Sequence, residues 1–154
     1  MAERFAPSGA AAVVRRALEE ARNRGDRRLG TEHLLLGVIG DPQSEVALAL
    51  GVDLESARAA LDALDRAALA SIGLDVGSLR LPKLPPARKR PPLTSAARYV
   101  LLRAINESGR LKARRSTPRH ILLALLAREP PDPAAALMAQ LGIHRALVRE
   151  RLEG

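Results

Sequence analysis

The chain has 154 residues, of which 47% are apolar, and a formal net charge of +8. These values fit one folded domain or two very small ones, and they exclude a chain that is disordered throughout. Phe5 and Tyr99 are the only aromatic residues, so the core must consist of Leu, Ala, Val and Ile, which favours helices over strands. The absence of cysteine excludes disulfides, thiolate metal sites and a cysteine nucleophile.

The charge is distributed unevenly along the chain. Residues 1–78 carry nine basic and twelve acidic side chains, a net −3, whereas residues 79–154 carry sixteen and five, a net +11. This asymmetry points to an anionic partner. Because 22 of the 25 basic residues are arginine, a compositional habit of the whole genome explains the charge equally well.

No apolar run approaches the roughly 20 residues that a membrane span needs, and the N-terminus lacks the basic-then-apolar pattern of a signal peptide. We therefore expect a soluble protein of the cytoplasm with no membrane contact.

Turn signals predict four short helices in the first half of the chain, separated by glycines and by the break at residues 40–42. They cover about residues 8–24, 30–39, 43–50 and 54–70, with Asp53 as the cap of the last helix.

Residues 80–92 contain five prolines, which forbid a helix and predict an extended linker. Its basic residues either dock on an anion or are solvated. Helices resume at Thr94, and Thr117 followed by Pro118 is a favoured helix start. Residues 129–133 (EPPDP) interrupt the helical pattern, and Gly142 separates the last two helices.

The two halves are similar to each other in three registers. Segment 31–39 (TEHLLLGVI) aligns with 118–126 (PRHILLALL), so that His33 meets His120. An i, i+3, i+4 apolar stripe precedes both segments, and residues 50–52 (LGV) align downstream with 141–143 (LGI). Three registers in the same order predict an all-α double repeat, with repeat 1 at 1–78, the linker at 79–92 and repeat 2 at 93–154.

Several motifs together resemble a known family. Residues 3–5 (ERF), 19–22 (EEAR) and especially 29–37 (LGTEHLLLG) resemble the N-terminal domain of Clp-type AAA+ unfoldases, in particular the ClpC branch. The resemblance implies two four-helix repeats related by a pseudo-twofold axis. It also implies a module that receives adaptors and substrates, including proteins phosphorylated on arginine, and that binds certain cyclic-peptide antibiotics.

The sequence holds no Gly-x-x-x-x-Gly-Lys-Ser/Thr loop for a nucleotide phosphate, so the resemblance is to the receiving module without its motor. The chain is either part of a larger unfoldase or a free-standing protein that competes for the ligands of a Clp system. No nucleophile motif is present, and we expect neither enzymatic activity nor a cofactor.

The resemblance implies a ligand site at Thr31 and Glu32, where a carboxylate suits a guanidinium and a helix start suits a phosphate. The alternative is that Thr31 caps the helix and Glu32 complements its dipole. In the second repeat Pro118 and Arg119 occupy these places, and Arg119 repels a guanidinium. We expect further contacts in the groove between the repeats, near residues Phe5, Leu93, Arg98 and Arg119.

His33 and His120 have no second ligand at i+3 or i+4, so we expect structural roles and no metal. The rival function is nucleic-acid binding by the basic half, although no aromatic residue apart from Tyr99 is available for base stacking. The residues that would contact phosphates are Arg88, Lys89, Arg90, Arg110, Lys112, Arg114 and Arg115.

Overall fold

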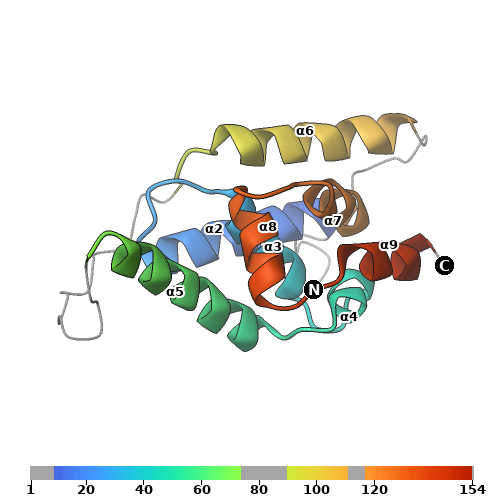
Figure 1. The fold of residues 1–154 in the computed structure, drawn as a ribbon. Helices are drawn as coiled ribbons and strands as arrows, with labels where there is room; N and C mark the ends of the chain where they lie inside the picture. The colour runs from blue at the N-terminus through green and yellow to red at the C-terminus, as the bar shows by residue number, and fades with distance from the viewer. Residues whose placement is uncertain (1–8, 74–89, 111–116, 154) are drawn as a thin grey trace.

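The computed structural model describes residues 9–73, 90–110 and 117–153, with the backbone alone for residues 109 and 110. All regular secondary structure in these ranges is helical (Figure 1). The helices of the first half are α2 (Gly9–Arg24), α3 (Thr31–Ile39), α4 (Glu45–Leu50) and α5 (Leu54–Ser71). Those of the second half are α6 (Ser95–Arg110), α7 (Pro118–Leu126), α8 (Pro133–Gln140) and α9 (Arg145–Glu153).

The predicted helices are confirmed, with small differences at their ends. The third helix begins at Glu45 rather than at residue 43, because the Ser44 hydroxyl accepts the Ala47 N–H and caps it. Gly51 and Gly142 follow the third helix of each half with φ near +70°, a left-handed conformation that glycine adopts without strain. The repeat boundaries at 78 and 92 stay a prediction, since most of the linker lies outside the described residues.

The helix pairs obey a pseudo-twofold exchange of the two halves. α2 packs on α3 as α6 packs on α7, and α3 meets α7. Each contact between the halves has a counterpart under this exchange. The α3–α8 contact corresponds to the α7–α4 contact, α5–α8 corresponds to α9–α4, and α2–α7 corresponds to α6–α3. The all-α double repeat that the sequence predicts is therefore the architecture of this chain.

The core runs continuously through both halves and centres on α3 and α7. Its largest fully buried side chains are aliphatic, and they include the following residues of those two helices: Leu34, Leu35, Leu36, Ile121, Leu122 and Leu125. Burial of aliphatic surface supplies the main stabilisation of such a fold, at about 25 cal/mol per Å². The single tyrosine, Tyr99, lies outside this core, half exposed on α6.

The approach of α2 to α3 depends on a glycine. A Cβ added to Gly37 would lie 2.4 Å from the carbonyl oxygen of Val13, which is closer than any Cβ can lie. The Gly37 carbonyl in turn accepts a hydrogen bond from Arg16 Nε at 2.8 Å. In repeat 2 the position that matches Gly37 is Ala124, so α6 and α7 accommodate a methyl group there.

Among the described residues, no helix is both long and apolar enough to cross a membrane. The same part of the chain contains no group of three or more His, Cys, Asp or Glu side chains placed to hold a metal ion.

Candidate functional site

An isolated parallel bridge between Leu29 and Leu93 places the start of α3 beside the start of α6. The Leu29 N–H donates to the Pro92 carbonyl at 2.9 Å, and the Thr94 N–H donates to the Leu29 carbonyl at 2.9 Å. The structure therefore brings half-buried Leu93 to the Thr31 and Glu32 end of α3, although more than sixty residues separate them in sequence.

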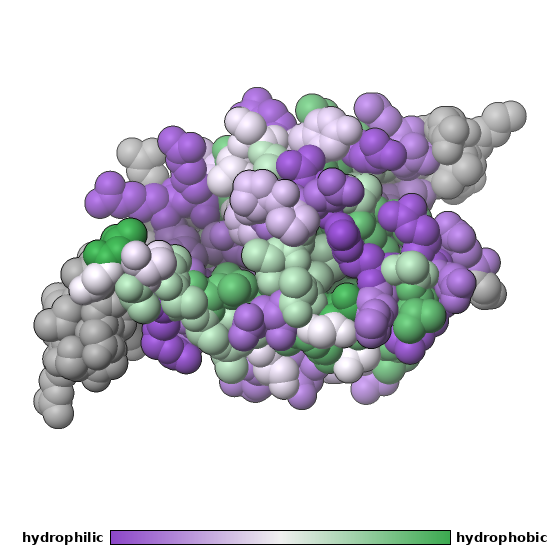
Figure 2. All heavy atoms as spheres, in the orientation of Figure 1, coloured by the Kyte–Doolittle hydropathy of each residue, from purple (hydrophilic) through white to green (hydrophobic). Residues whose placement is uncertain are grey.

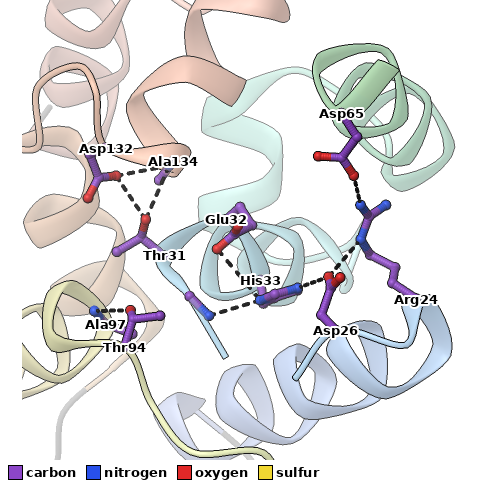
Figure 3. A network of polar contacts seen from close by, with 11 residues as sticks. Arg24, Asp26, Thr31, Glu32, His33, Asp65, Thr94, Ala97, Asp132 and Ala134 are labelled. Atoms are coloured by element: carbon purple, nitrogen blue, oxygen red, sulfur yellow. Dashed lines mark hydrogen bonds and ion pairs between the residues drawn. The ribbon is translucent and has the colours of Figure 1, made fainter. Parts of the chain in front are cut away.

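Thr31 joins the two repeats. It is the first residue of α3, after Gly30 at the N-cap, and its side chain is buried. Its hydroxyl donates to Asp132 Oδ1 at 2.8 Å and accepts the Ala134 N–H at 3.2 Å (Figure 3). The alternative in which Thr31 caps its own helix is therefore wrong, because its oxygen serves the N-terminus of α8 instead.

Asp132 is the partner that sequence reasoning missed. Its Oδ1 also accepts the N–H groups of Ala134 and Ala135, at 2.9 and 3.3 Å, and so caps α8. Its Oδ2 accepts a hydrogen bond from Arg128 Nε at 2.9 Å. An aspartate directly before a proline is a helix-start signal, but nothing local to it indicates a bond to a residue 101 positions away.

The Glu32 side chain folds back over Gly30. A Cβ on Gly30 would lie 1.9 Å from Glu32 Oε1, so the glycine is what leaves room for the carboxylate. The side chain is 21% exposed, and its buried Oε1 has no hydrogen-bond partner. Burial raises the pKa of Glu32 above its ordinary value. That oxygen lies 3.6 Å from His33 Nδ1, beyond hydrogen-bond distance (Figure 3), so it is held out of water without a hydrogen bond.

His33 has a structural role, as the sequence predicts. Its Nδ1 accepts the Gly30 N–H at 2.9 Å, and its Nε2 lies 2.7 Å from Asp26 Oδ2. Burial alone would raise the pKa of Asp26, but hydrogen bonds from His33 and Arg24 lower it. Arg24 continues the chain of contacts to α5, through Asp62 and through Asp65, of which Figure 3 shows the second. This network fixes the backbone at Gly30, next to Glu32.

The matching corner of repeat 2 keeps the histidine and loses the junction. His120 Nδ1 accepts the Thr117 N–H at 3.0 Å, as His33 does for Gly30. However, Pro118 has no hydroxyl to offer, and the start of α7 borders a cavity of about 750 Å³ against the start of α4. The cavity is lined by Ser44, Glu45, Val46, Thr117, Pro118, Arg119, His120, Leu123 and Glu153.

The other predicted site residues are dispersed. Arg98 is exposed on the first turn of α6, whereas Arg119 lines the separate cavity beside α4. Phe5 lies outside the described residues. So do five of the seven candidate phosphate contacts, while Arg110 is described by its backbone alone and Arg90 is exposed ahead of α6. Of the predicted site residues, the structure therefore brings Thr31, Glu32 and Leu93 to one corner and places Arg119 at another.

The chain is similar to a family of domains and to individual known proteins. Residues 8–140 match the family model described as the Clp repeat (R) N-terminal domain. The chain is 30% identical over 145 residues to the chloroplastic chaperone protein ClpC1 of Oryza sativa subsp. japonica, covering 92% of this chain and 14% of that protein. It is 29% identical over 155 residues to a ClpA homolog, an ATP-binding subunit of the ATP-dependent Clp protease, from Cyanidium caldarium. That match covers 99% of this chain and 16% of the relative.

Solved structures share the fold. The N-terminal domain of the chaperone ClpD from Arabidopsis thaliana superposes with a TM-score of 0.68 at 22% identity, covering 99% of this chain and 97% of that domain. The Hsp104 N-terminal domain from Candida albicans gives a TM-score of 0.57 at 18% identity, covering 94% of this chain and 86% of that domain. The double repeat and the match over residues 8–140 show that the chain belongs to the family of Clp repeat N-terminal domains.

Proposed function

We propose that this chain recognises substrates or adaptors for a Clp unfoldase, and that it does so at the corner formed by Gly30, Glu32 and Leu93. The observation that carries the proposal is the Glu32 carboxylate, whose buried Oε1 has no hydrogen-bond partner. A buried polar atom without a partner costs about 1–3 kcal/mol. A side chain kept at that cost is more simply explained by a ligand than by the fold.

The ligand chemistry that suits this corner is a guanidinium carrying a phosphate. Glu32 offers a carboxylate to the planar N–H fork of an arginine, and the first N–H groups of α3 favour an anion. The resemblance to ClpC-like domains supports phosphoarginine as that ligand. Thr31 acts here as a positioning residue, because its hydroxyl already bonds to Asp132 and Ala134.

Repeat 2 does not offer a second copy of this site. Arg119 stands where repeat 1 has Glu32, and a guanidinium ligand would meet a like charge there. We therefore propose one phosphoarginine site per chain. A free-standing chain with one such site would compete with a full unfoldase for the same ligands, and its corner is also the candidate surface for cyclic peptides.

Calorimetric titration with free phosphoarginine tests the proposal, with arginine and phosphoserine as ligand controls. We expect saturable binding at one site, lost in Glu32→Ala and retained in Arg119→Ala. Heat without saturation, or unchanged affinity in Glu32→Ala, would contradict the assignment. Circular dichroism of each variant shows whether a loss of binding comes from a folded protein.

The pH dependence gives a second check on Glu32. Binding a cation needs the ionised carboxylate, and burial raises the pKa of Glu32. The affinity for phosphoarginine should therefore fall as the pH is lowered, beginning at a higher pH than an ordinary glutamate would cause. Titrations across this range in Arg119→Ala should show the same profile, because its Glu32 is intact.

A further inference from the structure

The outer face of α6 carries an apolar stripe that nothing in the described residues covers. Tyr99, Leu102 and Ile105 are 51%, 54% and 57% exposed, and they account for half of the large exposed apolar side chains in the described part of the chain. Their spacing of three residues places them next to one another along a helix. The opposite face of α6 is buried through Ala97, Val100 and Ala104.

The matching face of α2 is different, so the fold does not require the stripe. With His33 aligned to His120, the positions that match Tyr99, Leu102 and Ile105 on α2 hold Ala12, Arg15 and Leu18. Ala12 is buried, Leu18 is half-buried and the central position is an exposed arginine. Single exposed apolar residues are ordinary, but three in a row on one face mark an interaction surface.

Arginines flank the stripe on both sides. Arg98 is exposed, and among the described residues its side chain has no hydrogen bond or ion pair. Within the described part of the chain, the Arg103 side chain donates one hydrogen bond, to the Tyr99 hydroxyl at 3.4 Å. The Arg128 guanidinium lies 5.5 Å from the centre of the Tyr99 ring and thereby orients it. In Figure 2 the upper edge of the molecule, where α6 runs in Figure 1, is mainly hydrophilic with a few apolar atoms between.

We propose that the outer face of α6 docks an acidic amphipathic helix of a partner protein. Apolar side chains at i, i+3, i+4 and i+7 of that helix would lie along Tyr99, Leu102 and Ile105, and its acidic flanks would pair with Arg98 and Arg103. The class of partner, an adaptor or a substrate segment, rests on the proposed function. The surface itself is separate from Glu32, so the two proposals can fail independently.

Tyr99 makes this surface directly observable. It is the only tyrosine in a chain without tryptophan, so intrinsic fluorescence reports on the stripe alone. The probe is a synthetic peptide of about 18 residues, with leucines at i, i+3, i+4 and i+7 and glutamates on both flanks. The controls are a scrambled peptide of the same composition and a peptide with lysine in place of glutamate.

We expect a saturable change in tyrosine fluorescence with the acidic peptide and no saturation with either control. Leu102→Glu, and separately Arg98→Glu with Arg103→Glu, should weaken binding at least tenfold. Arg15→Glu, at the matching position of α2, should leave it unchanged. Far-UV circular dichroism establishes that each variant is folded.

Equal binding of the scrambled peptide, or unchanged affinity in Leu102→Glu, would overturn the proposal. The same variant tests two other occupants, a second copy of the chain and a membrane. If the acidic peptide does not bind, a dimer that sedimentation detects and that Leu102→Glu abolishes would overturn the proposal. Binding to vesicles of anionic lipid that is lost in Leu102→Glu, again without peptide binding, would also overturn it. Phosphoarginine titration of Leu102→Glu and peptide titration of Glu32→Ala separate this surface from the Glu32 corner, because each variant should affect only its own ligand.

Discussion

The two corners of the molecule, one at the start of α3 and one at the start of α7, share a plan and differ in how they are closed. Both use a histidine Nδ1 to hold the N–H of the residue before the helix. In the first corner Thr31 then bonds to Asp132 and Ala134 of the other repeat. In the second, Pro118 lines a cavity of about 750 Å³ together with Ser44 and Val46.

This difference shows which contacts the fold needs in both repeats and which occur in one repeat alone. The histidine satisfies a helix-terminal N–H inside each repeat, so both copies keep it. The junction between repeats is an addition, since apolar packing of α3 against α7 already holds the halves together. The closed corner, at Thr31, therefore fixes Glu32 in a defined place. The open corner, at Pro118, has Arg119 in place of the glutamate and no counterpart of the Thr31 hydroxyl bonds.

The largest expected effect comes from removing the closing residue of the first corner. Asp132→Ala deletes the α8 cap, the bond from Thr31 and the bond from Arg128, which should cost about 3 kcal/mol of unfolding free energy. Ser44→Ala, which removes the α4 cap and an exposed hydrogen bond to the Asp41 carbonyl, should cost about 1 kcal/mol. Urea denaturation measures both, and equal losses would mean that the two corners are closed to the same degree.

Thr31→Val tests the junction from its other side with little change of shape. It should cost about 1.5 kcal/mol, because the buried carboxylate and the Ala134 N–H each lose a partner. In a double-mutant cycle with Asp132→Ala the two losses should fall short of additivity by more than about 0.5 kcal/mol. Additive losses would show that Thr31 and Asp132 stabilise the fold separately.

Glu32→Gln should stabilise the protein while abolishing the proposed ligand binding. Because burial raises the pKa of Glu32, its ionisation destabilises the fold as the pH rises above the ordinary glutamate value of about 4.3. The variant should therefore be more stable by about 1 kcal/mol at pH 7 and equal to the wild type near pH 3. Thermal unfolding at both pH values measures this, and destabilisation at pH 7 would assign Glu32 to the fold.

The smallest effect is expected at the open corner. Leu123 is half-buried beside the cavity, so Leu123→Phe has room and should change the unfolding free energy by less than about 0.5 kcal/mol. Ala134→Leu, its control at the fully buried closed corner, should cost about 2 kcal/mol through overpacking. Similar losses in both variants would mean that the cavity is filled in solution.

The fold could be predicted from the sequence because its signals are local. Apolar stripes at helical spacing, the glycines after residues 24, 50 and 141, and the self-alignment through His33 and His120 gave the helices and the double repeat. The site could be predicted only in part. The motif around Glu32 is enough to make it a candidate, whereas the Thr31 bond to Asp132 spans 101 positions and leaves no pattern in either segment.

The sequence also does not predict which charged side chains lie close to one another. Arg98 and Arg119 look like members of one groove, yet they lie on different helices and Arg119 lines a cavity of its own. Which arginines are paired depends on the approach of helices such as α2 and α5, where Arg58 bonds to Glu20 and Arg24 to Asp62. Side-chain spacing within one helix does not report such approaches.

The glycine contact between α2 and α3 has a consequence for the ancestry and engineering of this chain. Gly37 admits the Val13 carbonyl to a distance that the methyl group of Ala124 would block if it were placed there. The two repeats are thus not interchangeable, although their first two helices pack as corresponding pairs. A gene fusion that duplicates repeat 2 in both positions would need a new spacing between its first two helices before it could form this domain.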